Sequence, residues 1–284
     1  MLSRLSKDLS PKAKPTWDKD LELATAAAQK VVAVHHHLHT WLKVGMTLPQ
    51  IDSEVRATLQ KLGCRSAFYK YDKVPKLPPF PNHACLSVNA CVVHGTAAAY
   101  TLPMKPGDLL KIDIGVWFQG FVGDAGWTYH FGTPNPTAQK LMAVGKESLR
   151  LGIAELRPGQ PLLKFAQAVQ GHVEREHGLH LVRGLGGHGY GRKVHESPFV
   201  SNSVPESPGE WPDHSLRCQP GLLIAVEPMI AVGTGEVVSE HNRWPVLSRD
   251  NSMTVHYEHD VMVAPEGPRI LTAGMDDIQD IIER

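Results

Sequence analysis

The sequence shows no excess of charge of either sign and no long apolar run. Its 284 residues include 29 Lys and Arg and 29 Asp and Glu, so the formal net charge at pH 7 is zero. This balance provides no electrostatic basis for a nucleic-acid surface or an anionic membrane surface. No segment reaches the roughly 18 apolar residues of a membrane-spanning helix. The polar stretch at residues 3–15 also lacks the apolar region of a secretory signal.

Cysteines are scarce as well, and no two of them form a CxxC pair. Scattered thiols of this kind support neither a disulfide framework nor a structural zinc site. We therefore expect buried free thiols and a protein of the reducing cytoplasm. The cysteines are Cys64, Cys85, Cys91 and Cys218.

Hydrophobic residues make up 42% of the chain, which is enough for one large domain or for two tightly joined halves. Residues 1–15, which end at Pro15, are predicted to form a mobile arm. Residues 16–284 are predicted to form a single folded domain. Prolines and polar residues predict loops at residues 71–83 and 201–220, whose positions relative to a site the sequence leaves open.

Two helices are predicted near the beginning of this domain. Residues 18–42 are rich in Ala and Leu, and the histidine-rich stretch at 35–39 is interpreted as a polar helix face rather than a metal site. The second helix begins where Thr47 and Gln50 have the spacing of a capping box. Apolar residues then follow at helical spacing, and Gly63 suits the C-terminal cap.

The pattern around the second helix returns 114 positions later in the chain. At this offset, Pro106-Gly107 aligns with Pro220-Gly221, and Asp113 aligns with Glu227. One repeat is too few for a solenoid, so we predict an α+β domain with two pseudo-symmetric halves and a site between them. Chance similarity of two amphipathic helices is the alternative. The other matched pairs are Gly45 with Gly159, Leu48 with Leu162, Ile51 with Phe165, Val55 with Val169, Leu59 with Val173 and Leu109 with Leu223.

Several potential metal ligands stand in strand-like or glycine-rich segments where a purely structural account would expect Val, Ile or Leu. Buried carboxylates without a counter-charge would cost several kcal/mol. Two divalent cations would supply that charge. The five candidate ligands are Asp113, Asp124, His188, Glu227 and Glu258.

The first two carboxylates belong to a predicted β-hairpin. A two-residue turn at Phe118-Gln119 would place Asp113 directly opposite Asp124. A turn one residue later would make them diagonal neighbours on the same face. Carboxylates on an exposed hairpin face are the alternative interpretation.

Three histidines are candidates for the same site. His188 and His195 belong to a glycine-rich segment that permits close backbone approach, and a neutral imidazole is a good transition-metal ligand. His195 is better explained as a polar group that faces a substrate. His94 ends an apolar strand and, by itself, is more often a structural histidine.

These segments, in this order, resemble type I methionine aminopeptidases. The resemblance covers roughly residues 18–270 and implies the α+β "pita-bread" fold, in keeping with the internal repeat. The matching segments are residues 87–89, 94–95, 111–115, 123–124, 187–192, 195–196, 226–229 and 257–259.

The resemblance also implies roles for the ligands of two metal ions. Asp113 resembles the bidentate ligand of one ion, and Asp124 and Glu258 resemble bridging carboxylates. His188 and Glu227 resemble ligands of the other ion. Cobalt, manganese, iron and zinc all suit these ligands.

Further site residues follow from the same resemblance. His94 and His195 match the two catalytic histidines that do not bind metal, and Glu227 matches the group that relays a proton. The walls of the methionine pocket are matched by Cys85, Phe80 and Trp244.

The implied activity is removal of the N-terminal methionine from nascent proteins with a small second residue, by a hydroxide that bridges the two ions. The expected partners are nascent chains at the ribosome, with neither nucleic acid nor membrane bound directly, and the expected state is a monomer. An Xaa-Pro aminopeptidase or prolidase shares the fold and ligands and is the alternative enzyme. A non-catalytic peptide- or ribosome-binding relative is the alternative from another class.

The chain departs from the family pattern at three places. Val194 precedes His195 where the family usually has an aromatic residue, so we expect a softer pocket wall. Residues 96–99 replace the usual Ile-Pro type of segment after His94-Gly95, and the loop at residues 201–220 is long. None of these changes removes a predicted ligand or catalytic group.

Overall fold

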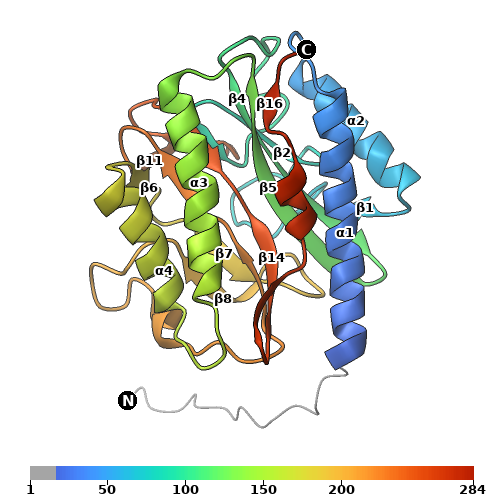
Figure 1. Cartoon of the computed structure of the whole chain (residues 1–284). Helices are drawn as coiled ribbons and strands as arrows, with labels where there is room; N and C mark the ends of the chain where they lie inside the picture. The colour runs from blue at the N-terminus through green and yellow to red at the C-terminus, as the bar shows by residue number, and fades with distance from the viewer. Residues whose placement is uncertain (1–16) are drawn as a thin grey trace.

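The computed structural model describes residues 17–284, and the predicted arm at residues 1–15 lies outside this range. Figure 1 shows α1 on one side of the molecule and α3 and α4 on the other, with the long strands β4, β5 and β14 between them. The helices are α1 (Trp17–Trp41), α2 (Leu48–Lys61), α3 (Pro136–Ala154) and α4 (Leu163–Gln170), a π-helical turn η1 (Gly171–Glu176), and two 3-10 turns, η2 (Pro212–Ser215) and η3 (Ala273–Asp277).

The first half of the chain is built around an antiparallel hairpin of two long strands. The order of this sheet is β1-β4-β5-β16, with β2 also paired to β4 and with β16 parallel to β5. Its strands are β1 (Arg65–Ser66), β2 (Cys85–Val88), β4 (Leu109–Phe118), β5 (Phe121–Phe131) and β16 (Ile281–Ile282).

The second half contains a corresponding sheet of order β15-β14-β9-β7-β8, and two small sheets, β13-β10-β6 and β11-β12-β3. The strands of the larger sheet are β7 (Gly186–Gly189), β8 (Glu196–Ser201), β9 (Leu223–Val226), β14 (His259–Ala264) and β15 (Gly267–Ile270). The strands of the small sheets are β3 (Cys91–Val93), β6 (His180–Leu181), β10 (Met229–Ala231), β11 (Val237–Ser239), β12 (Val246–Ser248) and β13 (Thr254–His256).

The predicted internal repeat is present in the backbone of the two halves. Gly45 has φ +91° and its N–H donates to Met104 O at 2.7 Å. Gly159 has φ +82° and its N–H donates to Cys218 O at 2.8 Å, the same bond 114 positions later. Positive φ is costly for residues with a Cβ, so the repeated glycines mark the same turn before each second helix.

Helix α1 packs closely on β5 because small residues meet there. A Cβ on Gly123 would lie 2.5 Å from the Ala27 carbonyl carbon and 2.6 Å from Ala28 N. In the other half, a Cβ on Gly145 of α3 would lie 2.8 Å from the Tyr257 ring. Each half therefore holds its covering helix against its strands through a glycine.

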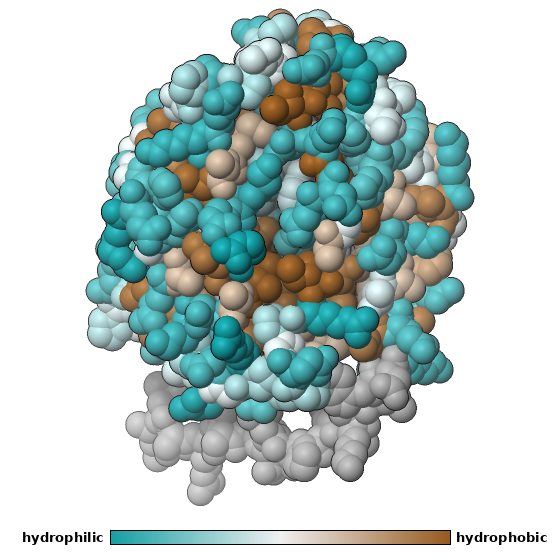
Figure 2. Space-filling model, in the orientation of Figure 1, coloured by the Kyte–Doolittle hydropathy of each residue, from teal (hydrophilic) through white to brown (hydrophobic). Residues whose placement is uncertain are grey.

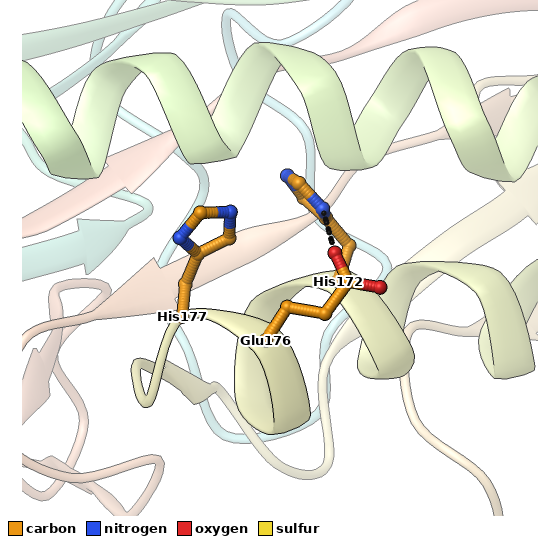
Figure 3. Close-up of side chains that lie close together, drawn as sticks. All are labelled: His172, Glu176 and His177. Atoms are coloured by element: carbon orange, nitrogen blue, oxygen red, sulfur yellow. Dashed lines mark hydrogen bonds and ion pairs between the residues drawn. The ribbon is translucent and has the colours of Figure 1, made fainter.

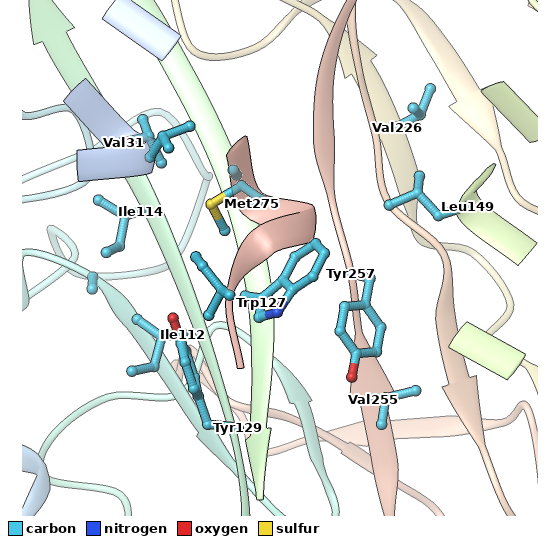
Figure 4. Packing of buried hydrophobic residues seen from close by; sticks show 14 of the residues in the cluster. Val31, Ile112, Ile114, Trp127, Tyr129, Leu149, Val226, Val255, Tyr257 and Met275 are labelled. Atoms are coloured by element: carbon cyan, nitrogen blue, oxygen red, sulfur yellow. The ribbon is translucent and has the colours of Figure 1, made fainter. Parts of the chain in front are cut away.

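The core continues across the junction of the halves (Figure 4). Trp127 of β5 and Tyr257, between β13 and β14, pack edge to face with ring centroids 4.9 Å apart. The Tyr257 hydroxyl donates to Asp280 Oδ2 at 3.3 Å, so the buried phenol keeps a polar partner. Both side chains are essentially fully buried.

The outer face of the helical layer is polar. Figure 2 shows hydrophilic residues over most of the face seen in Figure 1, with hydrophobic residues gathered in a band near its lower centre. Across residues 17–284, no helix has the length and apolar character needed to cross a membrane. All four cysteines are buried and free, as expected.

The interpretation of residues 35–39 as a polar face is wrong for His35. His35 is fully buried, with Nδ1 2.9 Å from the Tyr129 hydroxyl and Nε2 3.2 Å from Ala125 O. Burial lowers its pKa from 6.5 to about 3. One imidazole of this run therefore points into the contact between α1 and β5. The next imidazole of the run is exposed, because consecutive residues of a helix do not share a face.

We predict that His35 makes the fold acid-sensitive. Below about pH 6.5 the unfolded chain binds a proton at this ring that the folded protein excludes until about pH 3. Through this group, the free energy of unfolding should therefore fall by about 1.4 kcal/mol for each unit by which the pH decreases between these two values. His35→Gln should flatten the dependence measured by urea unfolding between pH 5 and pH 7, whereas exposed His36→Gln should not. Equal slopes for the two variants would contradict this role.

Candidate metal centre and substrate pocket

All ten residues predicted for the site line one cavity of about 640 Å³. They come from both halves and from the Pro-rich loop, although as many as 178 positions separate them in sequence, from Phe80 to Glu258. The ten are Phe80, Cys85, His94, Asp113, Asp124, His188, His195, Glu227, Trp244 and Glu258.

The hairpin register differs from the first expectation by one residue. Phe118 pairs with Phe121, so the turn is Gln119-Gly120, with φ +49° and +85°. Two positive φ values are typical of the turn that best matches strand twist, and glycine favours its second position. Asp113 therefore pairs with Gly126 rather than with Asp124, as in the alternative register.

The diagonal arrangement makes room for side chains from the second half. A Cβ on Gly126 would lie 2.9 Å from His256 Cε1 and 3.1 Å from Glu258 Oε2. Glu258 also donates its backbone N–H to Gly126 O at 2.9 Å. The glycine opposite Asp113 thus lets the second half bring its own groups against the first carboxylate pair.

The other ligands lie at the corresponding end of the second sheet. Val226 pairs with His259, so Glu227, directly after β9, and Glu258, directly before β14, lie at adjoining strand ends. His188 of β7 pairs with Ala225 of β9, and its Nε2 lies 3.7 Å from Glu227 Oε1.

Buried carboxylates and unpaired polar atoms fit divalent cations at this place. Asp113 Oδ1 and Asp124 Oδ1 are buried without a hydrogen-bond partner. Burial raises the pKa of Asp113 to about 7. It also raises the pKa values of Asp124, Glu227 and Glu258 well above their ordinary range. Anionic oxygens crowded in this way require positive charge if they are to stay ionised.

Among residues 17–284, two compact sets of potential ligands include residues that line this pocket, although His256 itself does not line it. One consists of Asp124, His188 and Glu258, and the other of Glu227, His256 and Glu258. Within each set the ligand atoms lie within 4.8 Å of one another. Glu258 belongs to both sets, as a bridging group would. Asp113 lines the same pocket but belongs to neither set.

Sequence reasoning gave no role to two buried groups beside these ligands. His256 Nε2 lies 3.2 Å from Glu227 Oε2 and 3.9 Å from Glu258 Oε2. Asp260 Oδ2 accepts the Asp124 backbone N–H at 2.8 Å. A signal was available, because His256, Glu258 and Asp260 occur at every second position of a strand-like segment, although His259 interrupts the apolar positions between them.

One wall of the pocket is apolar and aromatic. The rings of Phe80 and Trp244 meet edge to face at 5.1 Å, and Trp244 Nε1 donates to Pro78 O at 2.8 Å. Cys85 and Val194 are buried in the same hydrophobic cluster. Phe80 is therefore held by the Pro-rich loop at residues 71–83, which borders the pocket.

The two predicted non-ligand histidines also face this pocket. The His94 ring meets Trp244 edge to face at 5.9 Å, and burial lowers its pKa to about 4, so it is neutral near pH 7. The His195 ring packs against His188 with centroids 4.5 Å apart. Its Nδ1 lies 2.8 Å from the Tyr71 hydroxyl, a contact that was not predicted.

Carboxylates and imidazoles of this kind beside an apolar pocket define a metal-dependent hydrolase that accepts an apolar side chain. The profile of Metallopeptidase family M24 matches residues 22–265. The chain therefore belongs to metallopeptidase family M24, among its methionine aminopeptidases. Members of this family use divalent metal ions, in agreement with the ligands described above.

Two methionine aminopeptidases are similar in sequence to this protein over most of the chain. A methionine aminopeptidase of Aquifex aeolicus is 34% identical over 259 residues, which cover 89% of this chain and 96% of the relative. Methionine aminopeptidase 1 of Bacillus subtilis is 32% identical over 254 residues, with the same coverage of 89% and 96%.

Solved structures confirm the predicted pita-bread fold. The methionine aminopeptidase of Thermotoga maritima is 29% identical and superposes with a TM-score of 0.80, covering 89% of this chain and 96% of that one. A prolidase of Pyrococcus furiosus is 17% identical with a TM-score of 0.67, and the match covers 89% of this chain but only 64% of that one. The second likeness concerns the fold alone.

Proposed function

We propose that this protein removes the N-terminal methionine from proteins whose second residue is small. The observation that carries the proposal is the convergence of all ten predicted site residues on one pocket. An acidic, imidazole-bearing side of that pocket adjoins an apolar, aromatic one. The first suits hydrolysis and the second suits an unbranched thioether side chain.

The carboxylates and His188 would hold two divalent ions. Asp113, Asp124 and Glu258 would serve one ion, and His188, Glu227 and the shared carboxylates the other. When bound, such ions act as Lewis acids and lower the pKa of water enough to supply a nucleophile near neutral pH. The native metal among Co, Mn, Fe and Zn would be found by elemental analysis of protein purified without added ions.

The remaining groups would handle protons and charge. Glu227, which bound cations would keep ionised, would accept a proton from the attacking water and pass it to the leaving amine. His195 would donate from Nε2 to the methionyl carbonyl oxygen as negative charge develops there. His94, which is neutral near pH 7, would form a hydrogen bond with the substrate close to its scissile nitrogen.

The pocket wall would select the first residue. Phe80, Trp244 and Cys85 form an apolar surface on which the two aromatic rings meet edge to face. Such a surface suits the polarizable thioether of a methionine side chain. Val194 belongs to the same hydrophobic cluster, although it does not line the pocket itself. Because it is smaller than an aromatic side chain, the wall should tolerate somewhat larger first residues.

Comparing two peptide types tests the proposal. A Met-Ala-Ser peptide should be cleaved at its first bond, and an Ala-Pro peptide should be cleaved at least about 100-fold more slowly in kcat/KM. Faster cleavage of Ala-Pro would favour a prolidase-like enzyme. Absence of cleavage of either peptide, in protein that contains metal, would favour a non-catalytic peptide-binding role.

Tyr71 gives a test of the role of His195. Its hydroxyl, whose pKa burial raises, remains a donor near neutral pH and lies 2.8 Å from His195 Nδ1. This bond would keep the imidazole proton on Nε2, where the carbonyl oxygen would receive it. Tyr71→Phe should lower kcat about 10-fold with little change in KM, because such supporting bonds orient a catalytic ring. An unchanged kcat would show that Tyr71 does not position His195.

We propose the cytoplasm as the site of action and nascent chains at the ribosome as substrates. Four buried free thiols fit a reducing compartment. The chain is proposed to act as a monomer, because every predicted site residue comes from one copy. Size-exclusion chromatography with light scattering would measure that state directly.

A further inference from the structure

We propose a second metal site, formed by His172, Glu176 and His177, for a borderline divalent transition-metal ion such as Zn²⁺. The three residues come from the π-helical turn η1 and its C-terminal cap. None of them lines the catalytic pocket. Figure 3 shows both imidazoles standing between the helix that carries them and the neighbouring helix α3.

The unusual helical turn is what brings the two imidazoles together. In an α-helix, residues five apart point about 140° away from each other. A π turn, with its wider i→i+5 hydrogen bonding, returns the sixth residue to a place above the first. His172 and His177 have this spacing, and their ring centroids are 4.6 Å apart. An uninterrupted α-helix would have separated them.

The side chains are already close to a chelating arrangement. His172 Nδ1 lies 2.9 Å from Glu176 Oε2, and one ligand atom from each residue lies within 4.8 Å of the others. Ligand atoms of a tetrahedral zinc ion are about 3.3 Å apart when the bonds are about 2.0–2.1 Å. Modest changes in side-chain torsion would therefore close the site.

The donor set identifies the class of ion. Two neutral imidazoles and one carboxylate suit Zn²⁺, Ni²⁺ or Cu²⁺ better than Mg²⁺ or Ca²⁺, which prefer oxygen ligands. The His172 side chain is only 11% exposed whereas Glu176 is 65% exposed, so one side of the site is anchored and the other is open to solvent. A nearby ammonium, Lys140 Nζ, donates to the His177 backbone oxygen at 2.8 Å.

The location suggests a structural rather than a catalytic effect. The turn η1 ends shortly before β6, which pairs with β10. Strand β10 begins two residues after the proposed ligand Glu227. An ion bound only by the folded turn would stabilise this connection by mass action.

Counting bound zinc tests the proposal without relying on activity. Metal-free protein would be dialysed against ZnCl₂ and analysed for zinc per chain. Wild type should bind one equivalent more than His177→Ala, and the control His241→Ala, at an exposed histidine, should match wild type. Equal zinc contents in wild type and His177→Ala would overturn the proposal. If the catalytic pocket bound no metal, the difference of one equivalent would remain, so the two hypotheses fail separately.

A second variant guards against a folding defect. Glu176→Gln changes a largely exposed side chain without changing its size, so the turn should be retained. It should weaken zinc binding at this site at least about 10-fold, because the anionic ligand is lost. Undiminished affinity in Glu176→Gln would remove the carboxylate from the site and contradict the three-ligand arrangement.

Discussion

Asp124→Asn should lower kcat/KM for a Met-Ala-Ser peptide by on the order of 10³ or more. Asp124 lies in one of the two compact ligand sets, and its Oδ1 is buried without another partner. Losing an anionic ligand should cost several kcal/mol of transition-state stabilisation, and each 1.36 kcal/mol is tenfold in rate. The fold should persist, because the bond to Asp260 uses the backbone N–H of residue 124.

Steady-state kinetics together with metal analysis would check this result. The matched control is Glu196→Gln, an exposed carboxyl on the rim of the same pocket, which should stay within a few-fold of wild type. Undiminished activity of Asp124→Asn, with the protein folded, would exclude Asp124 as a metal ligand. A loss of activity in Glu196→Gln of the same size would show only a general sensitivity of the pocket to charge.

Removal of metal by a chelator should abolish activity and also destabilise the fold. Without cations, the carboxyls whose pKa values burial raises remain in an environment that opposes their ionisation. Ligand binding to the folded state alone contributes a few kcal/mol at saturating ion concentrations. For a chain of this size, that corresponds to a fall in Tm on the order of 10 °C.

Calorimetry and a peptidase assay on the same samples would measure both effects. Activity and Tm should return when Co²⁺, Mn²⁺, Fe²⁺ or Zn²⁺ is added back. Chelator should lower the Tm of Asp124→Asn less than that of wild type, because this variant has already lost affinity at the pocket. Full activity after verified removal of all metal would reject metal-dependent hydrolysis for this chain.

The secondary structure could be predicted best where the local pattern was complete. The helix at α2 has the expected capping contact, with the Thr47 backbone N–H donating to Gln50 Oε1 at 2.8 Å. The first of the two predicted hairpin registers, with its turn at Phe118-Gln119, is one residue early, because the structure turns at Gln119-Gly120. Turn conformation decides such a register, and glycine at a positive φ was the better local guide.

The candidate ligands could be proposed from the sequence, but their surroundings could not be predicted. Several carboxylates in apolar, strand-like segments together marked Asp113 and Glu227 as candidates, although a single Glu in a strand is weak evidence alone. His35 and Tyr71 could not be recognised in this way, because their positions depend on which element packs against them. His35 is buried by β5, and Tyr71 reaches His195 only because the Pro-rich loop folds over the pocket.

The repeat, the order of the candidate ligands and the acidic character of the candidate site could all be predicted from the chain alone, since each follows from residue type and spacing. Packing of the folded chain was needed to show that Gly126 leaves room for His256 and Glu258, and that a π turn brings the rings of His172 and His177 together edge to face. Steric space and the approach of distant side chains depend on how the surfaces of helices and strands pack together in the folded protein. No local pattern in the chain specifies which surfaces will meet.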